Sequence, residues 1–439
     1  MIRAPLEPSL WYATAAAAPD LRPLEDSLEA DVCIIGAGYT GLSTALHLAR
    51  DGVRVVVLEA EQVGYGGSGR NAGHCTPTFH FYSIPKVREM VGEPQAGRLI
   101  ERQTNAANLV GELVRRYQID CEWQQNGYIH AAHTPSALPK LEKHNETYRA
   151  IGKATRLLDR DEVAKLTGSD RFHGGWFHPE GGHLNPLGYS RGLARAVMSH
   201  GGQIFIRSRV VGIDAAGGRW TVRTSQGRVT ADKVVCGTGA YTDGFWPGLD
   251  RTFTIQPVFV AATQPLSDNI RRSVLPGNNT AHDGRGDLYC YKYNKEGRIV
   301  ASMFPSGRRG ADPAYTRQVM TDRLRWLHPQ IGEVQWDYLW WGDLDMQQRT
   351  IPRLFQLAPG IVASLGYSGR GVPTGTMMGT VLAEWAKGLP DKDLALKPER
   401  MAAAPAYMKI MPRLFQSYFR WRDNRAARRD GTELPPHAD

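Results

Sequence analysis

The sequence predicts a mixed α/β (α+β) fold with two interleaved domains, one built on a parallel sheet and one on an antiparallel sheet. Three observations indicate this. Residues 30–59 read as a strand, a glycine turn, a helix and a second strand. Residues 253–341 contain aromatic-rich stretches with the alternation that is typical of antiparallel strands. At 439 residues, the chain also exceeds one ordinary domain.

The stretch 30–59 carries the pattern on which the first domain depends. An apolar strand runs into a turn with the spacing G-x-G-x-x-G, apolar residues then recur at helical intervals, and a second strand ends in an acid. Strand, glycines, helix, strand and acid in this order form the Rossmann-like fingerprint of a dinucleotide site. The residues expected to contact the dinucleotide here are Gly36, Gly38, Tyr39, Thr40, Gly41 and Glu59.

Each part of this fingerprint has a physical reason. Gly36 allows the sharp turn, Gly38 lets a pyrophosphate approach the backbone, and Gly41 lets the helix pack close to the strand. The phosphates then meet the positive end of the helix dipole. Glu59 is expected to accept hydrogen bonds from ribose hydroxyl groups.

The segment that follows distinguishes NAD from FAD. A nicotinamide dehydrogenase would continue into another βα unit, whereas residues 63–77, VGYGGSGRNAGHCTP, are dense in glycine. FAD is longer than NAD and needs chain that runs past its pyrophosphate towards the isoalloxazine ring, so the segment predicts FAD. Its expected cofactor contacts are Gly67, Ser68, Asn71, Ala72 and Gly73.

Four sequence segments resemble a known family. They are SLWYATA from residue 9, GAGYTGLSTALHLA from residue 36, GYGGSGRNAGH from residue 64 and GYSGRGVPTG from residue 366. In these the chain resembles the D-amino-acid oxidase (DAO) family of FAD-dependent amine and amino-acid oxidoreductases, and within it most resembles the enzymes that oxidise gamma-glutamylputrescine. The resemblance implies a Rossmann-like FAD-binding domain interleaved with an antiparallel-sheet substrate domain that covers the flavin.

The resemblance also implies further cofactor contacts. The backbone of Val210 would meet the adenine, and Gly239 would pass close to the pyrophosphate. A helix N-terminus formed by Gly369, Arg370, Gly371 and Val372 would face the pyrimidine edge of the flavin and stabilise the negative charge of its reduced form. Relatives often carry histidine where Arg370 stands, which leaves its side chain open to a flavin contact or a structural ion pair.

The chemistry implied by the resemblance is the transfer of a hydride from an amine C–H to noncovalently bound FAD, giving an imine that hydrolyses to an aldehyde or keto acid. No protein nucleophile and no metal are expected. Candidate catalytic residues are His74, Tyr289, Tyr291 and Arg370. His74 follows the glycine block and is a candidate for assisting deprotonation; Tyr289 and Tyr291 alternate with Cys290 and so point the same way, as candidates for the substrate pocket.

Three functions stay open at this point. The first is oxidation of a polyamine derivative such as gamma-glutamylputrescine, and the second is oxidation of an amino or cyclic imino acid such as pipecolate, proline, sarcosine or a D-amino acid. The third is a flavin-binding protein without turnover. Either oxygen or a quinone is expected to reoxidise the flavin. An arginine facing the flavin in the pocket would favour an amino acid over a simple amine.

Composition excludes other classes. The net charge is +9, but the basic residues are scattered except near the C-terminus and no nucleic-acid motif is present. Five cysteines without a C-x-x-C pair predict neither disulfides nor zinc, and no apolar run suits a signal or membrane span, so a reduced cytoplasmic protein is expected.

The predicted domain boundaries follow from these assignments. The FAD-binding domain takes 25–110, 150–245 and 345–390, the substrate domain 111–149 and 246–344, and a basic amphipathic tail 391–439. Docking of the tail on the protein or a partner subunit is preferred, and peripheral membrane contact is the alternative.

Overall fold

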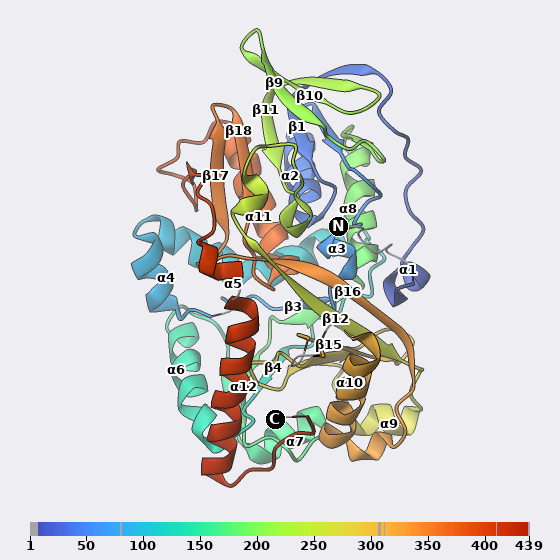
Figure 1. Ribbon diagram of the computed structural model, residues 1–439, viewed down its shortest axis with the longest axis vertical. Helices are drawn as coiled ribbons and strands as arrows, with labels where there is room; N and C mark the ends of the chain where they lie inside the picture. The colour runs from blue at the N-terminus through green and yellow to red at the C-terminus, as the bar shows by residue number, and fades with distance from the viewer. Residues whose placement is uncertain (1–7, 80, 306–308, 311, 410, 438–439) are drawn as a thin grey trace.

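The computed structural model describes residues 8–79, 81–305, 309–310, 312–409 and 411–437. The chain folds around two large sheets, a nine-stranded one in the upper half of Figure 1 and an eight-stranded one in the lower half. A short pair, β3 (His74–Cys75) with β7 (Gly182–His183), forms a third sheet. The predicted mixed α/β fold is confirmed.

The nine-stranded sheet is parallel at its centre. There β1 (Ser27–Ile35) lies between β2 (Val55–Leu58) and β11 (Arg228–Cys236). All four residues of β2 are buried, because a central parallel strand is covered on both faces. The other strands are β8 (Gln203–Phe205), β9 (Gly212–Ala216), β10 (Arg219–Arg223), β17 (Arg353–Ala358), β18 (Ile361–Leu365) and β19 (Glu399–Arg400).

Helices cover one face of this sheet. On β1, Val32 and Ile34 pack into the cluster that the helices share, whereas Cys33 and Ile35 pack into a cluster on the opposite face. This is the alternation that a strand imposes on its side chains. The covering helices are α2 (Tyr39–Arg50), α5 (Gln95–Arg116), α8 (Pro186–Ser199) and α11 (Gly371–Ala386).

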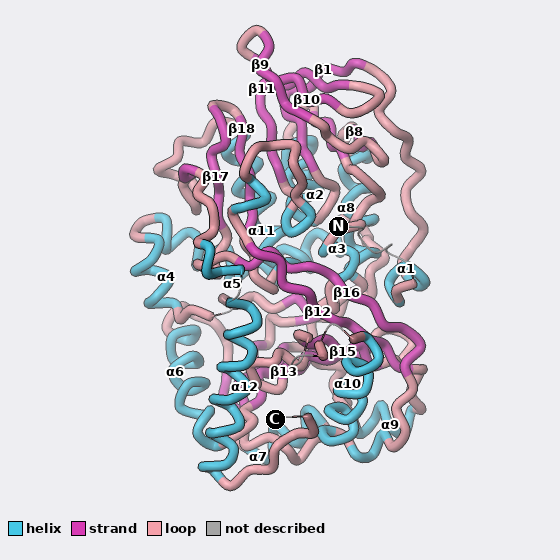
Figure 2. The backbone as a smooth tube through the Cα atoms, viewed as in Figure 1, coloured by secondary structure: helices cyan, strands magenta, loops and turns pink. Residues whose placement is uncertain are grey.

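The eight-stranded sheet is antiparallel except where β13 pairs with β4. Its strands in spatial order are β16 (Trp336–Met346), β12 (Thr254–Thr263), β15 (Ile299–Met303), β14 (Cys290–Tyr293), β13 (Thr280–His282), β4 (Tyr128–Ala131), β6 (Gly175–His178) and β5 (Arg156–Leu158). The long β12 and β16 pair runs across the middle of the molecule, between the two halves (Figure 2). One face of the eight-stranded sheet therefore faces the half of the molecule that contains the nine-stranded sheet.

The opposite face of the eight-stranded sheet is covered by α10 (Pro313–Leu327). Met320 and Leu324 of that helix pack against Phe259 and Ala301 of the sheet. Smaller helices complete the chain: α1 (Leu10–Thr14), α3 (Gly67–Arg70), α4 (Ile84–Val91), α6 (Leu138–Arg149), α7 (Arg160–Thr167) and α9 (Asp268–Ser273). Short 3₁₀ turns lie at Pro135–Ala137, Gly239–Tyr241, Leu249–Arg251, Pro329–Ile331 and Ala406–Lys409.

The predicted boundaries misplace two segments. The predicted tail 391–439 includes β19, which pairs with β17 in the nine-stranded sheet. Residues 150–245 were assigned as a whole to the FAD-binding domain, but β5 and β6 within that range pair with each other and with β4 in the eight-stranded sheet. Strand pairing between segments far apart in sequence decided this, and the local pattern carried no sign of it. The other boundaries stay a prediction.

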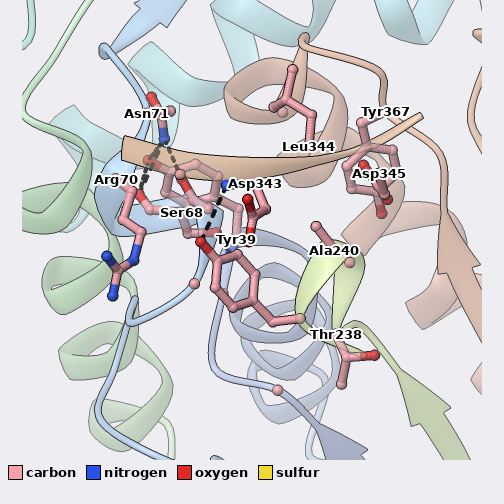
Figure 3. A pocket seen from close by; sticks show the side chains of 18 of the residues that line it. Tyr39, Ser68, Arg70, Asn71, Thr238, Ala240, Asp343, Leu344, Asp345 and Tyr367 are labelled. Carbon is pink, nitrogen blue, oxygen red and sulfur yellow. Dashed lines mark hydrogen bonds between the residues drawn. The ribbon is translucent and has the colours of Figure 1, made fainter. Parts of the chain in front are cut away.

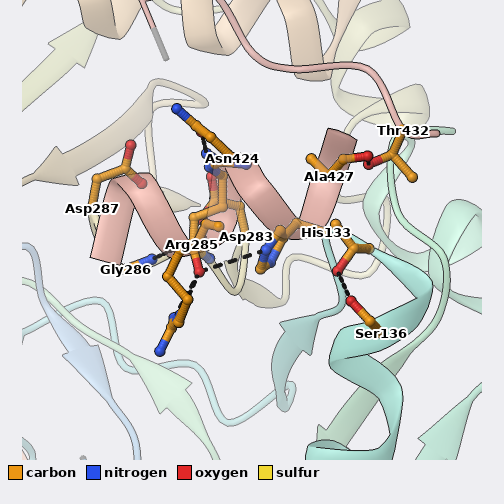
Figure 4. A network of polar contacts seen from close by, with 12 residues as sticks. His133, Ser136, Asp283, Arg285, Gly286, Asp287, Asn424, Ala427 and Thr432 are labelled. Carbon is orange, nitrogen blue, oxygen red and sulfur yellow. Dashed lines mark hydrogen bonds and ion pairs between the residues drawn. The ribbon is translucent and has the colours of Figure 1, made fainter. Parts of the chain in front are cut away.

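The C-terminal helix α12 (Met411–Asp430) docks on the second half of the molecule, where it runs along the front of Figure 1. Buried Asp423 accepts a hydrogen bond from the Gly286 backbone at 2.8 Å, and Asp430 accepts one from the Ser136 backbone at 2.9 Å. The Phe419 ring stacks on that of Phe81. Asn424 binds Arg285 (Figure 4). Along the described chain, we find no helix with the length and apolar character to cross a bilayer.

Candidate functional site

The main cleft opens where the parallel strands end. Ile35, Leu58 and Gly237, each at or just past the end of a central strand, contribute to its lining. Ligands of open α/β sheets bind at this edge. The cleft continues to the eight-stranded sheet, which contributes Val260 and Cys290. Both halves of the molecule therefore enclose one space.

The glycines of the fingerprint form a cradle with no room for side chains. Gly36 has φ +103°, and a Cβ atom on Gly38 would lie 2.8 Å from Ser68 Oγ. A Cβ on Gly41 would lie 2.0 Å from the Gly36 carbonyl oxygen. Helix α2 can therefore begin directly against the end of β1. Its N-cap residue, Gly38, offers no capping side chain, so the helix start suits a phosphate group.

A polar network fixes the glycine-rich block against this helix start (Figure 3). The Tyr39 hydroxyl donates to the Ser68 carbonyl at 2.6 Å, and Asn71 Nδ2 donates to the Tyr39 hydroxyl at 3.1 Å. Ser68 Oγ accepts from the Tyr39 backbone at 3.1 Å. The side chains of Tyr39 and Asn71 thus shape the cradle by holding its walls together.

Glu59 lies at the end of β2 and lines the cleft. Its two carboxylate oxygens accept hydrogen bonds from the backbone of Ala37 at 2.7 Å and of Glu61 at 3.0 Å. Burial raises its pKa, and these two backbone donors oppose that effect. Each oxygen has a further lone pair, which leaves Glu59 able to accept a ribose hydroxyl.

Most of the predicted cofactor contacts lie on this cleft. Gly41 and Gly73 do not line it, and both instead allow close backbone packing: a Cβ on Gly73 would lie 2.1 Å from the Leu184 carbonyl oxygen. The predicted residues that do line it are Gly36, Gly38, Tyr39, Thr40, Glu59, Gly67, Ser68, Asn71, Ala72, Val210, Gly239, Gly369, Arg370, Gly371 and Val372. Their individual contacts to FAD stay predictions.

His74 lines the cleft and pairs with Thr280 through Nδ1. Its Nε2 is buried without a hydrogen-bond partner. Burial, followed by the positive charge of Lys292, lowers its pKa well below the ordinary value. The imidazole is therefore neutral at physiological pH and has one ring nitrogen left for a ligand.

Lys292 is fully buried close behind the cleft. Its amine donates to the Leu184 carbonyl at 3.1 Å and lies 4.8 Å from the centre of the Trp11 ring. Burial lowers its pKa to about 8, and Glu122 and Cys121 oppose this shift. Since the unfolded chain keeps this proton up to roughly pH 10.4, folding becomes more favourable as pH rises from 8 to 10.

We expect Lys292→Met to remove this pH dependence. Wild-type unfolding free energy should gain about 2 kcal/mol more than that of the variant between pH 8 and pH 10, because only the wild type buries an ionisable amine. Denaturant unfolding at a series of pH values measures the difference. Lys295→Met, at an exposed position, is the control and should follow the wild type. If the unfolding free energies of Lys292→Met and the wild type changed in parallel with pH, the lowered pKa of Lys292 would be contradicted.

The turn between β18 and α11 closes the other end of the cleft. Asp345, at the end of β16, accepts a hydrogen bond from the Gly366 backbone at 2.7 Å, and burial raises its pKa to about 6. The Tyr367 hydroxyl hydrogen-bonds with Thr40 Oγ1 at 2.8 Å. Figure 3 shows Asp345 and Tyr367 side by side at this end. The turn is thereby tied to the start of α2.

The prediction that Tyr289 and Tyr291 lie in the substrate pocket is wrong. The two side chains do point the same way, but they point to the face that α10 covers, and both are fully buried there. The Tyr289 hydroxyl donates to the Met320 carbonyl at 3.2 Å. Cys290, between them, faces the cleft instead. Because neighbouring residues of a strand point to opposite faces, Cys290 could have been predicted to line the cleft once the face covered by α10 was known.

Other cleft residues escaped the sequence analysis. Thr76 and Ser302 carry no motif, and Asp345 is one acid among many. The lining residues that were not anticipated include Thr76, Arg209, Tyr241, Val258, Val260, Leu288, Cys290, Ser302, Asp343, Asp345 and Tyr367. They come from strands of the second sheet and from loops whose position depends on distant pairing.

Comparison with known proteins agrees with this geometry. The model of the family described as DAO, FAD dependent oxidoreductase, matches residues 31–385. The chain belongs to this family. It is 32% identical to gamma-glutamylputrescine oxidoreductase of Escherichia coli over 87% of this chain and 89% of the relative. It is also 32% identical to the probable oxidoreductase OrdL of Haemophilus influenzae over 82% and 84% of the two chains.

Solved structures share the fold of this family member. Glycine oxidase from Geobacillus kaustophilus superposes with a TM-score of 0.67 at 20% identity, covering 82% of this chain and 95% of its own. The protein is thus an FAD-dependent oxidoreductase, and its cradle fits that cofactor.

Proposed function

We propose that the protein oxidises the amine C–N bond of a polyamine derivative such as gamma-glutamylputrescine. One observation carries this proposal: the residues expected to hold FAD and the inner face of the second sheet line the same cleft. The identity of 32% to gamma-glutamylputrescine oxidoreductase over most of both chains supports the substrate class.

When bound, FAD accepts a hydride from the carbon beside a neutral amine, and the resulting imine hydrolyses in water to an aldehyde or keto acid plus the released amine. The chain itself has to hold the cofactor, orient that carbon and keep the amine neutral. His74 contributes a neutral imidazole whose Nε2 has no protein partner, so it can form a hydrogen bond with the substrate amine without adding positive charge. The start of α11 at Gly371 and Val372 supplies backbone donors and a helix dipole for negative charge.

The second candidate is oxidation of an amino or cyclic imino acid. One observation favours it: the guanidinium of Arg370 lies on the cleft, where it can bind a carboxylate.

The deciding experiment follows the visible spectrum of the purified holoenzyme without oxygen while single compounds are added. We expect gamma-glutamylputrescine to bleach the flavin band. The comparison compounds are putrescine, sarcosine, proline, pipecolate, glycine and D-alanine. Bleaching only by an amino or imino acid would replace the first candidate by the second. A spectrum that no compound changes would contradict both candidate substrate classes. Admitting air afterwards distinguishes oxygen from a quinone as the acceptor.

Contact with a membrane surface is proposed for the exposed side of α12. Leu414, Tyr418 and Trp421 follow each other at helical spacing and are each more than half exposed. Arg425 and Arg429 extend this side with positive charge. Aromatic and basic residues on one side of a helix complement an anionic lipid surface. Cytoplasmic location and quinone coupling stay predictions.

We expect the protein to sediment with vesicles that contain phosphatidylglycerol and not with pure phosphatidylcholine vesicles. Replacing Tyr418 and Trp421 together by serine should lower the bound fraction severalfold, because the apolar anchors are lost. Replacing Tyr12, an exposed aromatic residue in a distant helix, by serine is the control. Binding that the double substitution leaves unchanged would contradict the proposal.

A further inference from the structure

Leu288 lies on the cleft in a backbone conformation that leucine rarely adopts. It is in the loop between β13 and β14 and contributes to the lining of the cleft. Its φ angle is +60°, in the left-handed region where the Cβ atom of a non-glycine residue is crowded. Such residues persist only where the surrounding structure holds them, and they cluster at ligand-binding sites. The contacts that hold this loop therefore also determine the shape of the cleft.

Contacts from its own half of the molecule hold the loop on one side. The Leu288 backbone donates a hydrogen bond to the Arg285 carbonyl at 3.2 Å, which closes a tight turn. The Phe304 backbone, just after β15, donates to the Asp287 carbonyl at 3.2 Å. The Asp287 carboxylate also binds Arg323 of α10 at 2.6 Å. The residue directly before Leu288 is thus fixed from two elements.

The C-terminal helix α12 holds the same loop from the other side (Figure 4). Buried Asp423 accepts a hydrogen bond from the Gly286 backbone at 2.8 Å, and buried Asn424 accepts one from the Arg285 side chain. A Cβ atom added to Gly286 would overlap with the Phe419 side chain, so helix and loop are in close contact. These α12 residues lie outside the cleft lining. They therefore act on the cleft only through the loop.

Leu288 adds apolar surface to one wall of the cleft. The second sheet also contributes Val258 and Val260 from β12, and Cys290 and Ser302 from β14 and β15. Apolar side chains in a cleft are exposed to water until a ligand covers them, and covering them with methylene groups is favourable. A substrate with an aliphatic chain gains from such a wall, whereas a short polar substrate does not.

We infer that Leu288 is a specificity-determining residue, that α12 holds it in the cleft through Asp423, and that it selects substrates with an aliphatic chain over shorter ones. Asp423 is then a positioning residue. The inference rests on the proposed function and deepens it, because the methylene chain of a polyamine derivative provides the matching surface. Glycine and sarcosine lack such a chain.

Propanamide and hexanamide test this surface in the oxidised holoenzyme. Neither can be oxidised to an imine, because the carbon beside the amide nitrogen carries no hydrogen. We expect hexanamide to perturb the flavin spectrum at a concentration about tenfold or more below that of propanamide, since its additional methylene groups are buried. Leu288→Gly and Leu288→Asn should each reduce this preference about threefold or more.

Stability separates this role from a merely structural one. Leu288→Gly should change the denaturant midpoint little, because glycine adopts a positive φ without crowding. Leu157→Gly, at an exposed position in strand β5, is the matched control. It should lower stability, since glycine weakens a strand, and should keep the preference for hexanamide.

Asp423→Ala tests the contribution of α12. It should reduce the preference for hexanamide as Leu288→Gly does, whereas Asp423→Asn keeps an acceptor oxygen for the Gly286 backbone and should retain most of the preference. Asp430→Ala removes a similar bond of the same helix, to the Ser136 backbone, and should leave the preference unchanged.

Two results would overturn the inference. Equal affinity for the two amides in the wild type, no binding of hexanamide, or an unchanged preference in both Leu288 variants would contradict the role of Leu288. A wild-type preference in Asp423→Ala would contradict the role of α12. Because neither amide is turned over, these outcomes are distinct from a failure of the proposed function, which the anaerobic reduction of the flavin decides.

Discussion

Gly41→Ala is expected to yield a protein that loses most of its FAD. The new Cβ would lie 2.0 Å from the Gly36 carbonyl oxygen and 3.2 Å from Ile34 Cγ2. The Gly36 carbonyl is backbone and cannot rotate away as a flexible side chain can, and Ile34 is a fully buried side chain. Helix α2 must therefore move outward and take its N-terminus with it. Such overpacking costs about 1–3 kcal/mol or more, which corresponds to a tenfold to hundredfold weaker cofactor site.

The ratio of absorbance at the flavin band to absorbance of the protein measures this effect directly, and titration with FAD gives the affinity. Gly244→Ala is the matched control, because an added Cβ there meets nothing within 4 Å. It should retain FAD as the wild type does. Full occupancy of Gly41→Ala by FAD would show that close contact between α2 and β1 is not what positions the phosphates.

Arg323→Met is expected to produce the largest loss of stability. Arg323 on α10 is 2% exposed and binds Asp283 and Asp287, which lie in the loop before β14. Burial raises the pKa of Asp283 to about 7, against the effect of the arginine. Without the Arg323 guanidinium, the two buried carboxylates lose both ion pairs and keep only the charge of Arg285 and, for Asp287, that of Arg420. Removing one partner of such a group costs about 3–5 kcal/mol.

Denaturant unfolding measures this loss, and Arg317→Met, an exposed arginine on the same helix, should change stability little. The loop also carries Arg285 and Gly286, which bind Asn424 and Asp423 of α12. The network is drawn in Figure 4. We therefore expect the C-terminal helix to become more accessible to protease in Arg323→Met. Wild-type stability in this variant would mean that water replaces the guanidinium without cost.

The features that the sequence predicted correctly depend on short-range interactions. The close approach of the helix to the strand at residues 32–50 is local, because a Cβ on Gly41 would meet the Gly36 carbonyl oxygen, whereas Gly36 and Gly38 are constrained by the distant residues Gly237 and Ser68. The FAD cofactor and the family followed from these same motifs.

What the sequence alone determined is therefore the cofactor half: its fold, its glycine cradle and the acid at the end of β2. The tertiary structure decided the other wall of the cleft. Alternation showed that Tyr289 and Tyr291 share a face, but only the position of α10 determined that this face is the covered one. Likewise, Arg370 was a recognisable motif residue, and its reach towards Tyr128 depends on how two distant strands meet. Residue alternation and motif spacing are local properties of the sequence. Which face of a strand lines a pocket depends instead on the distant element that covers the opposite face.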